Sequence, residues 1–141
     1  MNVILVGTDA ALLEGLAQSF ATNGFAAQVV NSLIDACELA VDSRPIVALV
    51  ERDLAIASPG DTMSIQLASG GSLALFHGGD SGGVTPLRLQ RSVVAELILP
   101  LERARLVALT KSLAGRADVV GRKEERMDEI RHRWSPDELM P

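Results

Sequence analysis

Five short apolar runs, separated by segments with helical signals, constrain the fold of this chain more than any other feature of its sequence. The runs are NVILVG, FAAQVV, PIVALV, GSLALFHG and VVAELIL, and they begin at residues 2, 25, 45, 71 and 93. A continuous apolar run of this length is typical of a strand that is buried on both faces. Strands that alternate with helices need crossover connections, which place them in a parallel sheet covered on both sides. The sequence therefore predicts an α/β fold built on a doubly wound five-stranded parallel sheet.

Helix start and stop signals follow the first two runs. Thr8 or Asp9 can cap a first helix, and the pair at 23–24, Asn-Gly, ends it. Ser32 can cap a second helix, because its hydroxyl can accept the backbone N–H of Asp35 three residues on. Both connections are therefore predicted to contain regular helices.

The next two connections are predicted to form only irregular helices. Residues 56–70 contain Pro59 and Gly60 and few strong helix formers, and residues 77–86 are rich in glycine. A last helix is expected to begin at Pro100. Its inner face would be a stripe of leucines, at Leu106, Leu109 and Leu113.

Composition narrows the class of protein. The chain has 141 residues, of which 48% are hydrophobic and 22% charged, and this suits one globular domain with one core. Its net charge of −5 gives no general attraction to a phosphate backbone, so direct nucleic-acid binding is not expected. The opening MNVILVG does not fit a signal peptide, and no apolar run approaches the roughly 18 residues that span a bilayer. The single cysteine, Cys37, is expected to be a small core residue, and the protein is expected to be cytoplasmic, without membrane contact.

The crevice of a doubly wound sheet lies beyond the carboxyl ends of its strands, where the strand order reverses. The glycine-rich loop at 77–86 adds backbone N–H groups near that place, although it matches no nucleotide-binding motif. The other residues that follow the predicted strand ends, and so could line the crevice, are Gly7, Thr8, Asp9, Glu51, Arg52, Asp53, His77, Gly78 and Leu99.

With this order of elements, residues 1–116 resemble the receiver domain of bacterial two-component response regulators, which has flavodoxin-like topology. In that family an acidic pair ends the first strand and holds Mg²⁺, and an aspartate at the end of the third strand accepts a phosphoryl group. A Thr or Ser ends the fourth strand, and Lys-Pro ends the fifth. The corresponding positions here are Gly7 and Thr8, then Glu51, then His77, and then Leu99 before Pro100.

All four family roles are altered at these positions. Mg²⁺ prefers carboxylate oxygens, which Gly7 and Thr8 do not supply. Glu51 carries an extra methylene that displaces its carboxylate, so we interpret it as a permanent negative charge. Leu99 cannot neutralise a phosphoryl group, and Asp9 stands one place too late, where it either caps the first helix or partly replaces the acidic pair. The resemblance therefore implies a degenerate phosphoacceptor pocket, with no metal site, no cofactor and no enzymatic activity.

Two further expectations concern the neighbours of Glu51. Asp53 is the alternative acceptor if the alignment slips by two residues, because side chains two apart on a strand share a face. The matched position of His77 suggests a hydrogen bond between its imidazole and the Glu51 carboxylate.

The resemblance also implies an output face made by the fourth helix, the fifth strand and the last helix. Glu96 stands in this face where the family often has an aromatic switch residue. We therefore expect phosphorylation-independent signalling through protein partners, with a homodimer as one candidate assembly. The polar contacts of the face would be Arg88, Arg91, Glu96, Glu102, Arg103 and Arg105.

Two other functions stay open on the sequence alone. One is an unconventional phosphoryl-accepting response regulator that uses Glu51 or Asp53. The other is a small-ligand or nucleotide sensor that uses the crevice and the 77–86 loop.

Residues 117–141 differ from the rest of the chain in their dense mixed charge. Such a segment is predicted to be a solvated helical extension or a linker. Met127, Ile130 and Trp134 follow the spacing i, i+3, i+7, so they could contact the domain itself or a partner helix.

Overall fold

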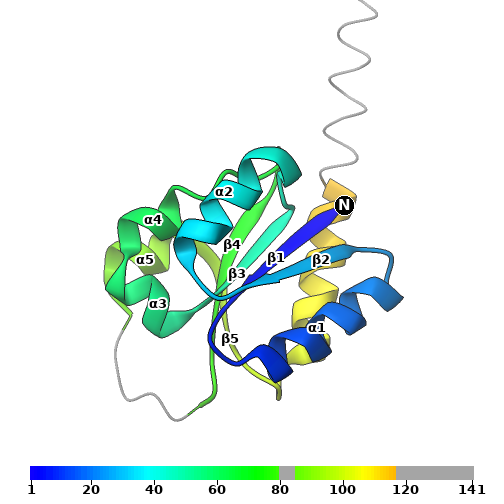
Figure 1. Ribbon diagram of the computed structural model, residues 1–141. Helices are drawn as coiled ribbons and strands as arrows, with labels where there is room; N and C mark the ends of the chain where they lie inside the picture. The colour runs from blue at the N-terminus through cyan, green and yellow to red at the C-terminus, as the bar shows by residue number, and fades with distance from the viewer. Residues whose placement is uncertain (80–84, 117–141) are drawn as a thin grey trace, which may run out of the picture.

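The computed structural model describes residues 1–79 and 85–116 of the chain (Figure 1). A helix over residues 103–116, called the last helix below, ends the described part. The predicted extension at 117–141 and residues 80–84 of the glycine-rich loop lie outside the described residues. The other elements, in chain order, are β1 (Asn2–Val6), α1 (Ala10–Thr22), β2 (Ala26–Val30), α2 (Leu33–Ser43), β3 (Val47–Glu51), α3 (Arg52–Ala57), α4 (Pro59–Met63), β4 (Ser72–His77), α5 (Leu87–Ser92) and β5 (Val93–Ile98).

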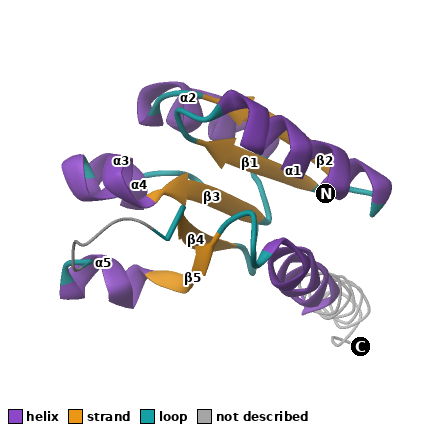
Figure 2. Ribbon diagram, turned by 90° about the horizontal axis from the view of Figure 1, so that it is seen from below, coloured by secondary structure: helices purple, strands orange, loops and turns teal. Residues whose placement is uncertain are grey.

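The five strands form one parallel sheet in the order β2-β1-β3-β4-β5. This order reverses between β1 and β3, as it does in flavodoxin-like folds. Helices α2 to α5 cover one face of the sheet, and α1 and the last helix cover the other (Figures 1 and 2). The predicted doubly wound five-stranded α/β fold is confirmed.

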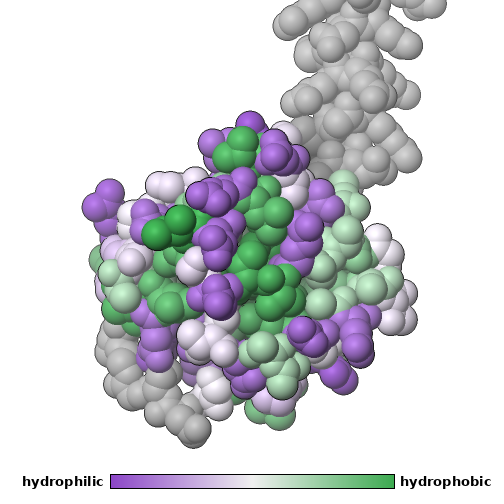
Figure 3. Space-filling view, viewed as in Figure 1, coloured by the Kyte–Doolittle hydropathy of each residue, from purple (hydrophilic) through white to green (hydrophobic). Residues whose placement is uncertain are grey.

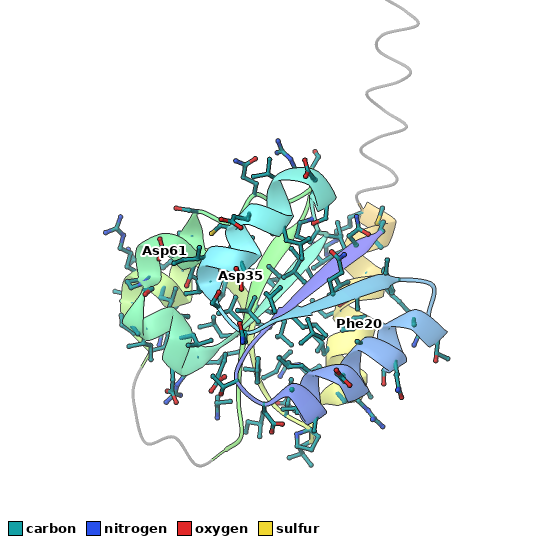
Figure 4. The ribbon with its side chains drawn as sticks, in the orientation of Figure 1. Phe20, Asp35 and Asp61 are labelled. Carbon is teal, nitrogen blue, oxygen red and sulfur yellow. The ribbon has the colours of Figure 1, made fainter. Side chains whose placement is uncertain are left out.

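Each face of the sheet has its own apolar cluster. Along β1, Val3 and Leu5 pack on the α1 side and Ile4 and Val6 on the α2 side, because successive strand residues point to opposite faces. All four side chains are fully buried, as expected for a strand with neighbours and helices on both sides. Phe20 of α1, labelled in Figure 4, belongs to the first cluster and meets Phe25 edge to face.

The first two helices are capped as their sequences predict. The Asp9 carboxylate accepts the backbone N–H of Leu12 at 3.1 Å, so Asp9 rather than Thr8 is the N-cap of α1. The Ser32 hydroxyl oxygen accepts the backbone N–H of Asp35 at 3.2 Å and caps α2. A chain reversal that starts at the C-cap of α1 then continues through Gly24, whose φ of +85° is readily adopted only by glycine.

The helices after β3 and β4 are short, as predicted. Three pieces, α3, α4 and α5, have six, five and six residues. None of the helices in the described ranges is both long and apolar enough to cross a bilayer.

The predicted start of the last helix at Pro100 is wrong by three residues, because a turn occupies residues 99–102. Two hydrogen bonds between Ile98 and Glu102 close this turn. The backbone N–H of Glu102 donates to the carbonyl of Ile98 at 2.7 Å, and the N–H of Ile98 donates to the Glu102 carboxylate at 2.9 Å. The helix therefore begins only after Glu102, at residue 103.

Candidate functional site

A crevice of about 570 Å³ opens at the carboxyl ends of the strands, at the reversal of strand order where it was expected. Three apolar side chains in its wall, Leu12, Phe76 and Pro100, are not among the residues that the sequence predicts there. Phe76 is the last buried residue before His77, a position that an alternating-face argument could have identified. The complete lining is Asp9, Leu12, Glu51, Asp53, Phe76, His77, Gly78, Leu99 and Pro100.

Glu51 is held at the end of β3 by Thr8, which follows β1. The backbone N–H of Thr8 donates to Oε2 of Glu51 at 2.8 Å, and the Thr8 hydroxyl donates to the same oxygen at 3.0 Å. A carboxylate that accepts two hydrogen bonds in this way is fixed in direction. Glu51 therefore points back to the end of β1, where the family resemblance places an acidic pair.

Gly7 is what allows Glu51 this position. A Cβ atom on residue 7 would lie 3.1 Å from Oε2 of Glu51, 3.0 Å from Cζ of Phe76 and 3.2 Å from Cδ1 of Leu13. The two contacts with carbon atoms are shorter than the optimum of about 3.5–4.0 Å for non-bonded carbon atoms, and the contact with the carboxylate oxygen is also tight. A larger side chain at position 7 and the present Glu51 conformation would therefore compete for one volume.

The expected hydrogen bond between His77 and Glu51 is wrong. Nδ1 of His77 accepts the backbone N–H of Gly79 at 3.1 Å, and the Glu51 carboxylate accepts from Thr8 instead. Gly79 has a φ of +93°, so the chain turns directly after this hydrogen bond in a conformation that favours glycine. Both side chains line the crevice, but the His77 imidazole is hydrogen-bonded to Gly79 and the Glu51 carboxylate to Thr8.

Two more carboxylates line the crevice, and they differ in their hydrogen bonding and exposure. Asp9 lines it while capping α1, whereas Asp53 is exposed in the first turn of α3. Within residues 1–79 and 85–116, no group of three or more His, Cys, Asp or Glu side chains is arranged so that it could hold a metal ion.

Leu99, which the resemblance matches to the family lysine, is almost fully buried, at 1% exposure. It packs in the core cluster on the α1 side of the sheet, with Leu97 and Leu106, and contributes one edge to the crevice wall. The apolar environment of this side chain would oppose a charged group there. This part of the crevice is therefore hydrophobic.

Arg52 does not line the crevice, so its expected place in the pocket is wrong. Its side chain is 7% exposed and lies 3.4 Å, Nη1 to Oε1, from Glu96 on β5. The Thr85 hydroxyl donates to the same Glu96 oxygen at 2.7 Å. Arg52 thus connects the start of α3 to Glu96 of β5, and Glu96 in turn binds Thr85, two residues before α5.

The residues expected on the output face fall into two groups. Arg88, Arg91 and Arg103 are exposed. Glu96 is paired as described, and Glu102 accepts hydrogen bonds from the N–H of Ile98 at 2.9 Å and from Arg105 at 2.6 Å. These two donors, the Ile98 N–H first, lower the pKa of Glu102 below its ordinary value. Met127, Ile130 and Trp134 lie outside the described residues.

No protein-family model matches this sequence, and no curated protein matches it significantly. Its structure is nevertheless similar to those of receiver domains. A CheY-like response regulator receiver domain from Methanospirillum hungatei JF-1 superposes with a TM-score of 0.63 at 19% identity, covering 83% of this chain and 96% of that one. A receiver domain protein from Clostridium thermocellum gives a TM-score of 0.67 at 9% identity, covering 84% of this chain and 98% of that one.

A third similar structure is the receiver domain of a sensor histidine kinase from Pseudomonas aeruginosa PAO1, with a TM-score of 0.62 at 17% identity and coverage of 81% of this chain and 97% of that one. That structure has a magnesium ion coordinated in its active-site cleft. At these identities the likeness establishes the fold, and this chain has the fold of receiver domains.

Proposed function

We propose that this chain is a degenerate receiver-like module that signals through protein–protein interaction without being phosphorylated, in a bacterial regulatory pathway. The observation that carries the proposal is the engagement of the Glu51 carboxylate by the backbone and hydroxyl of Thr8. Glu51, which the resemblance matches to the phosphoryl acceptor, is thereby hydrogen-bonded to Thr8, which it matches to a metal ligand. The module works in the cytoplasm, contacts neither membrane nor nucleic acid directly, and is not an enzyme.

The chemistry of phosphoryl transfer supports this proposal. Transfer to a carboxylate depends on positioning of the nucleophile and on cations that neutralise the developing charge. In this crevice Oε2 of Glu51 already accepts two hydrogen bonds from Thr8, and Leu99 presents a hydrocarbon at the position that the resemblance matches to a lysine. The steric limit at Gly7 disfavours restoring an acidic side chain there while Glu51 stays as it is.

An amide NMR titration tests the proposal. The full chain is titrated first with Mg²⁺ and then with beryllofluoride, a mimic of the phosphoryl group. We expect the amides of residues 7–9, 51–53 and 77–79 to stay unshifted at millimolar concentrations of both. Saturable shifts that spread to residues 88–106 would instead demonstrate a working phosphoryl switch.

A second candidate function, small-ligand sensing, is favoured by the shape of the crevice. Its volume of about 570 Å³ lies within the range of small-molecule sites, about 300–1,000 Å³. Its wall combines apolar groups such as Phe76 and Leu99 with the exposed carboxylate of Asp53, which suits an organic cation better than a nucleotide. A mass difference between the native and the denatured purified chain would identify such a ligand, and equal masses would argue against one that survives purification.

Unconventional phosphorylation is the remaining alternative, and the exposure of Asp53 in the crevice is what favours it. If the chain accepts a phosphoryl group from a small donor with Mg²⁺, fragmentation of the labelled protein would place it on Asp53 or Glu51. Labelling abolished by Asp53→Asn but retained in Glu51→Gln would assign Asp53.

A further inference from the structure

Two surfaces at opposite edges of the sheet carry opposite charge, and both expose large apolar side chains. The acidic stripe is the outer side of α2 and consists of Ile34, Asp35, Glu38, Val41 and Asp42. The basic edge is formed by α5 and the start of β5 and consists of Leu87, Arg88, Arg91 and Val94. In Figure 2, α2 lies at the upper edge of the molecule, and α5 and β5 lie at the lower edge.

The acidic stripe is a continuous helix face. Ile34, Glu38 and Val41 follow the spacing i, i+4, i+7, which places them on one side of α2. Ile34 is 67% exposed and Val41 50%, although both are large apolar residues. Figure 3 shows apolar and hydrophilic residues side by side over α2, and Figure 4 labels Asp35 there. Arg44 follows the stripe and donates its Nε–H to the carbonyl of Val41 at 3.3 Å, and the three acids Asp35, Glu38 and Asp42 outnumber this one cation. The stripe therefore presents exposed hydrocarbon together with net negative charge.

The basic edge has the complementary composition. Leu87 is 61% exposed and Val94 46%, and they flank Arg88 and Arg91, which are also exposed. The acid of β5 does not neutralise these arginines, because Glu96 is engaged internally by Arg52 and Thr85. The described part of this edge therefore presents positive charge and hydrocarbon to the solvent.

This charge distribution disfavours a symmetric dimer through the basic edge. In a two-fold dimer the same patch faces itself, so arginines would approach arginines. Like charges placed opposite each other oppose association, whereas opposite charges favour it. The chain itself offers the opposite charge on α2.

We propose that the acidic stripe of one copy docks on the basic edge of a second copy. The proposal rests on the proposed function, protein interaction, and names a second copy of this chain as the partner. Because the two surfaces lie at opposite edges, each copy in such a contact keeps one surface free. The contact is thus head to tail and can extend to further copies instead of closing into a pair.

The contact should be weak and sensitive to salt. The acidic stripe runs from residue 34 to residue 42, which is about 12 Å at about 1.5 Å per residue, and α5 is a helix of six residues. An interface between two such short helix faces is small, so association is expected only at high protein concentration. The Debye length falls from about 10 Å at about 0.1 M salt to about 3 Å at about 1 M, so high salt should dissociate the contact.

Sedimentation of two charge-reversed variants of the full chain tests this contact. The first carries Glu38→Lys and Asp42→Lys in the acidic stripe, and the second carries Arg88→Glu and Arg91→Glu in the basic edge. All four positions are exposed, and a glutamate at position 88 falls in the first turn of α5, where negative charge is tolerated. Circular dichroism verifies that each variant is folded. A variant with Lys111→Glu and Arg116→Glu on the last helix has the same charge change as the second variant, but outside both surfaces.

The proposal predicts that the wild type and the last-helix control grow beyond a dimer as concentration rises, while each reversed variant alone stays monomeric. A mixture of the two reversed variants should associate again, because the native acidic stripe of one meets the native basic edge of the other, and the introduced lysines meet the introduced glutamates. A monomeric wild type at millimolar concentration would overturn the proposal. So would dimers of the acidic-stripe variant alone, which would mean a symmetric contact through the basic edge. Neither result bears on the proposal for the crevice, which the NMR titration with Mg²⁺ and beryllofluoride tests separately.

Discussion

Replacing Gly7 by alanine probes the packing that lets Glu51 reach the end of β1. The added methyl carbon would lie 3.0 Å from Phe76, 3.1 Å from Glu51 and 3.2 Å from Leu13. Gly7 is not among the glycines with positive φ, so the cost of the substitution is steric. Overpacking of a well-packed site costs about 1–3 kcal/mol, and the gain from replacing a strand-end glycine offsets about 0.5–1 kcal/mol of that. We expect Gly7→Ala to lower the free energy of unfolding by about 1 kcal/mol.

The contribution of Glu51 to this cost is measured by a double-mutant cycle. In a Glu51→Ala background the carboxylate is absent, and Phe76 gains room to move away from the new methyl group. The cost of Gly7→Ala should then fall, with a coupling of about 0.5–1 kcal/mol between the two positions.

Urea unfolding provides the assay for all four proteins of the cycle. With a slope of about 1–3 kcal/mol per molar urea, a change of about 1 kcal/mol shifts the midpoint by about 0.3–1 M. An equal cost of Gly7→Ala in both backgrounds would refute the claim that residue 7 and Glu51 compete for the same volume.

Three further predictions concern groups outside the crevice. Hydrogen bonds lower the pKa of Glu102 in the folded state, so its carboxylate stabilises the fold at pH values above its ordinary pKa of 4.5, and this contribution is lost as the pH falls through the lower folded pKa. The urea midpoints at pH 6 and pH 3 should therefore differ less in Glu102→Gln than in the wild type. An equal difference in the two proteins would contradict this role of Glu102. Glu96→Ala should lower the free energy of unfolding by about 1–3 kcal/mol, because it removes the carboxylate that pairs with the buried Arg52 side chain. An unchanged free energy of unfolding in calorimetry would contradict this pairing. Burial, and secondarily the charge of Asp61, raise the pKa of the Cys37 thiol. At pH 8 the thiol should therefore react with a disulfide reagent more slowly in the folded chain than in urea. Equal rates would contradict this, because they would show that the thiol is freely accessible.

Local patterns were sufficient to predict the fold. The five apolar runs correspond to the five strands, and the cap at Ser32 was correctly placed, because both signals depend on residues close together in the sequence. The position of the crevice followed from topology alone, since the carboxyl ends of parallel strands meet at one edge of the sheet.

The side-chain contacts of the site could not be predicted in the same way. Arg52 follows Glu51 directly, yet its partner Glu96 is 44 residues away on another strand. The partner of His77 is the backbone of Gly79, which depends on a turn with positive φ that the glycine-rich sequence permits but does not specify. The late start of the last helix likewise depends on the Glu102 carboxylate folding back to Ile98.

Incubation with a small phosphodonor and Mg²⁺, followed by intact mass spectrometry, tests the central claim most directly. A conventional receiver domain is treated in parallel under identical conditions as a positive control. We expect the wild-type mass to stay unchanged and the control to gain one phosphoryl group. A gain of one phosphoryl group on wild-type Glu51 or Asp53 would contradict the proposal that this chain signals without being phosphorylated.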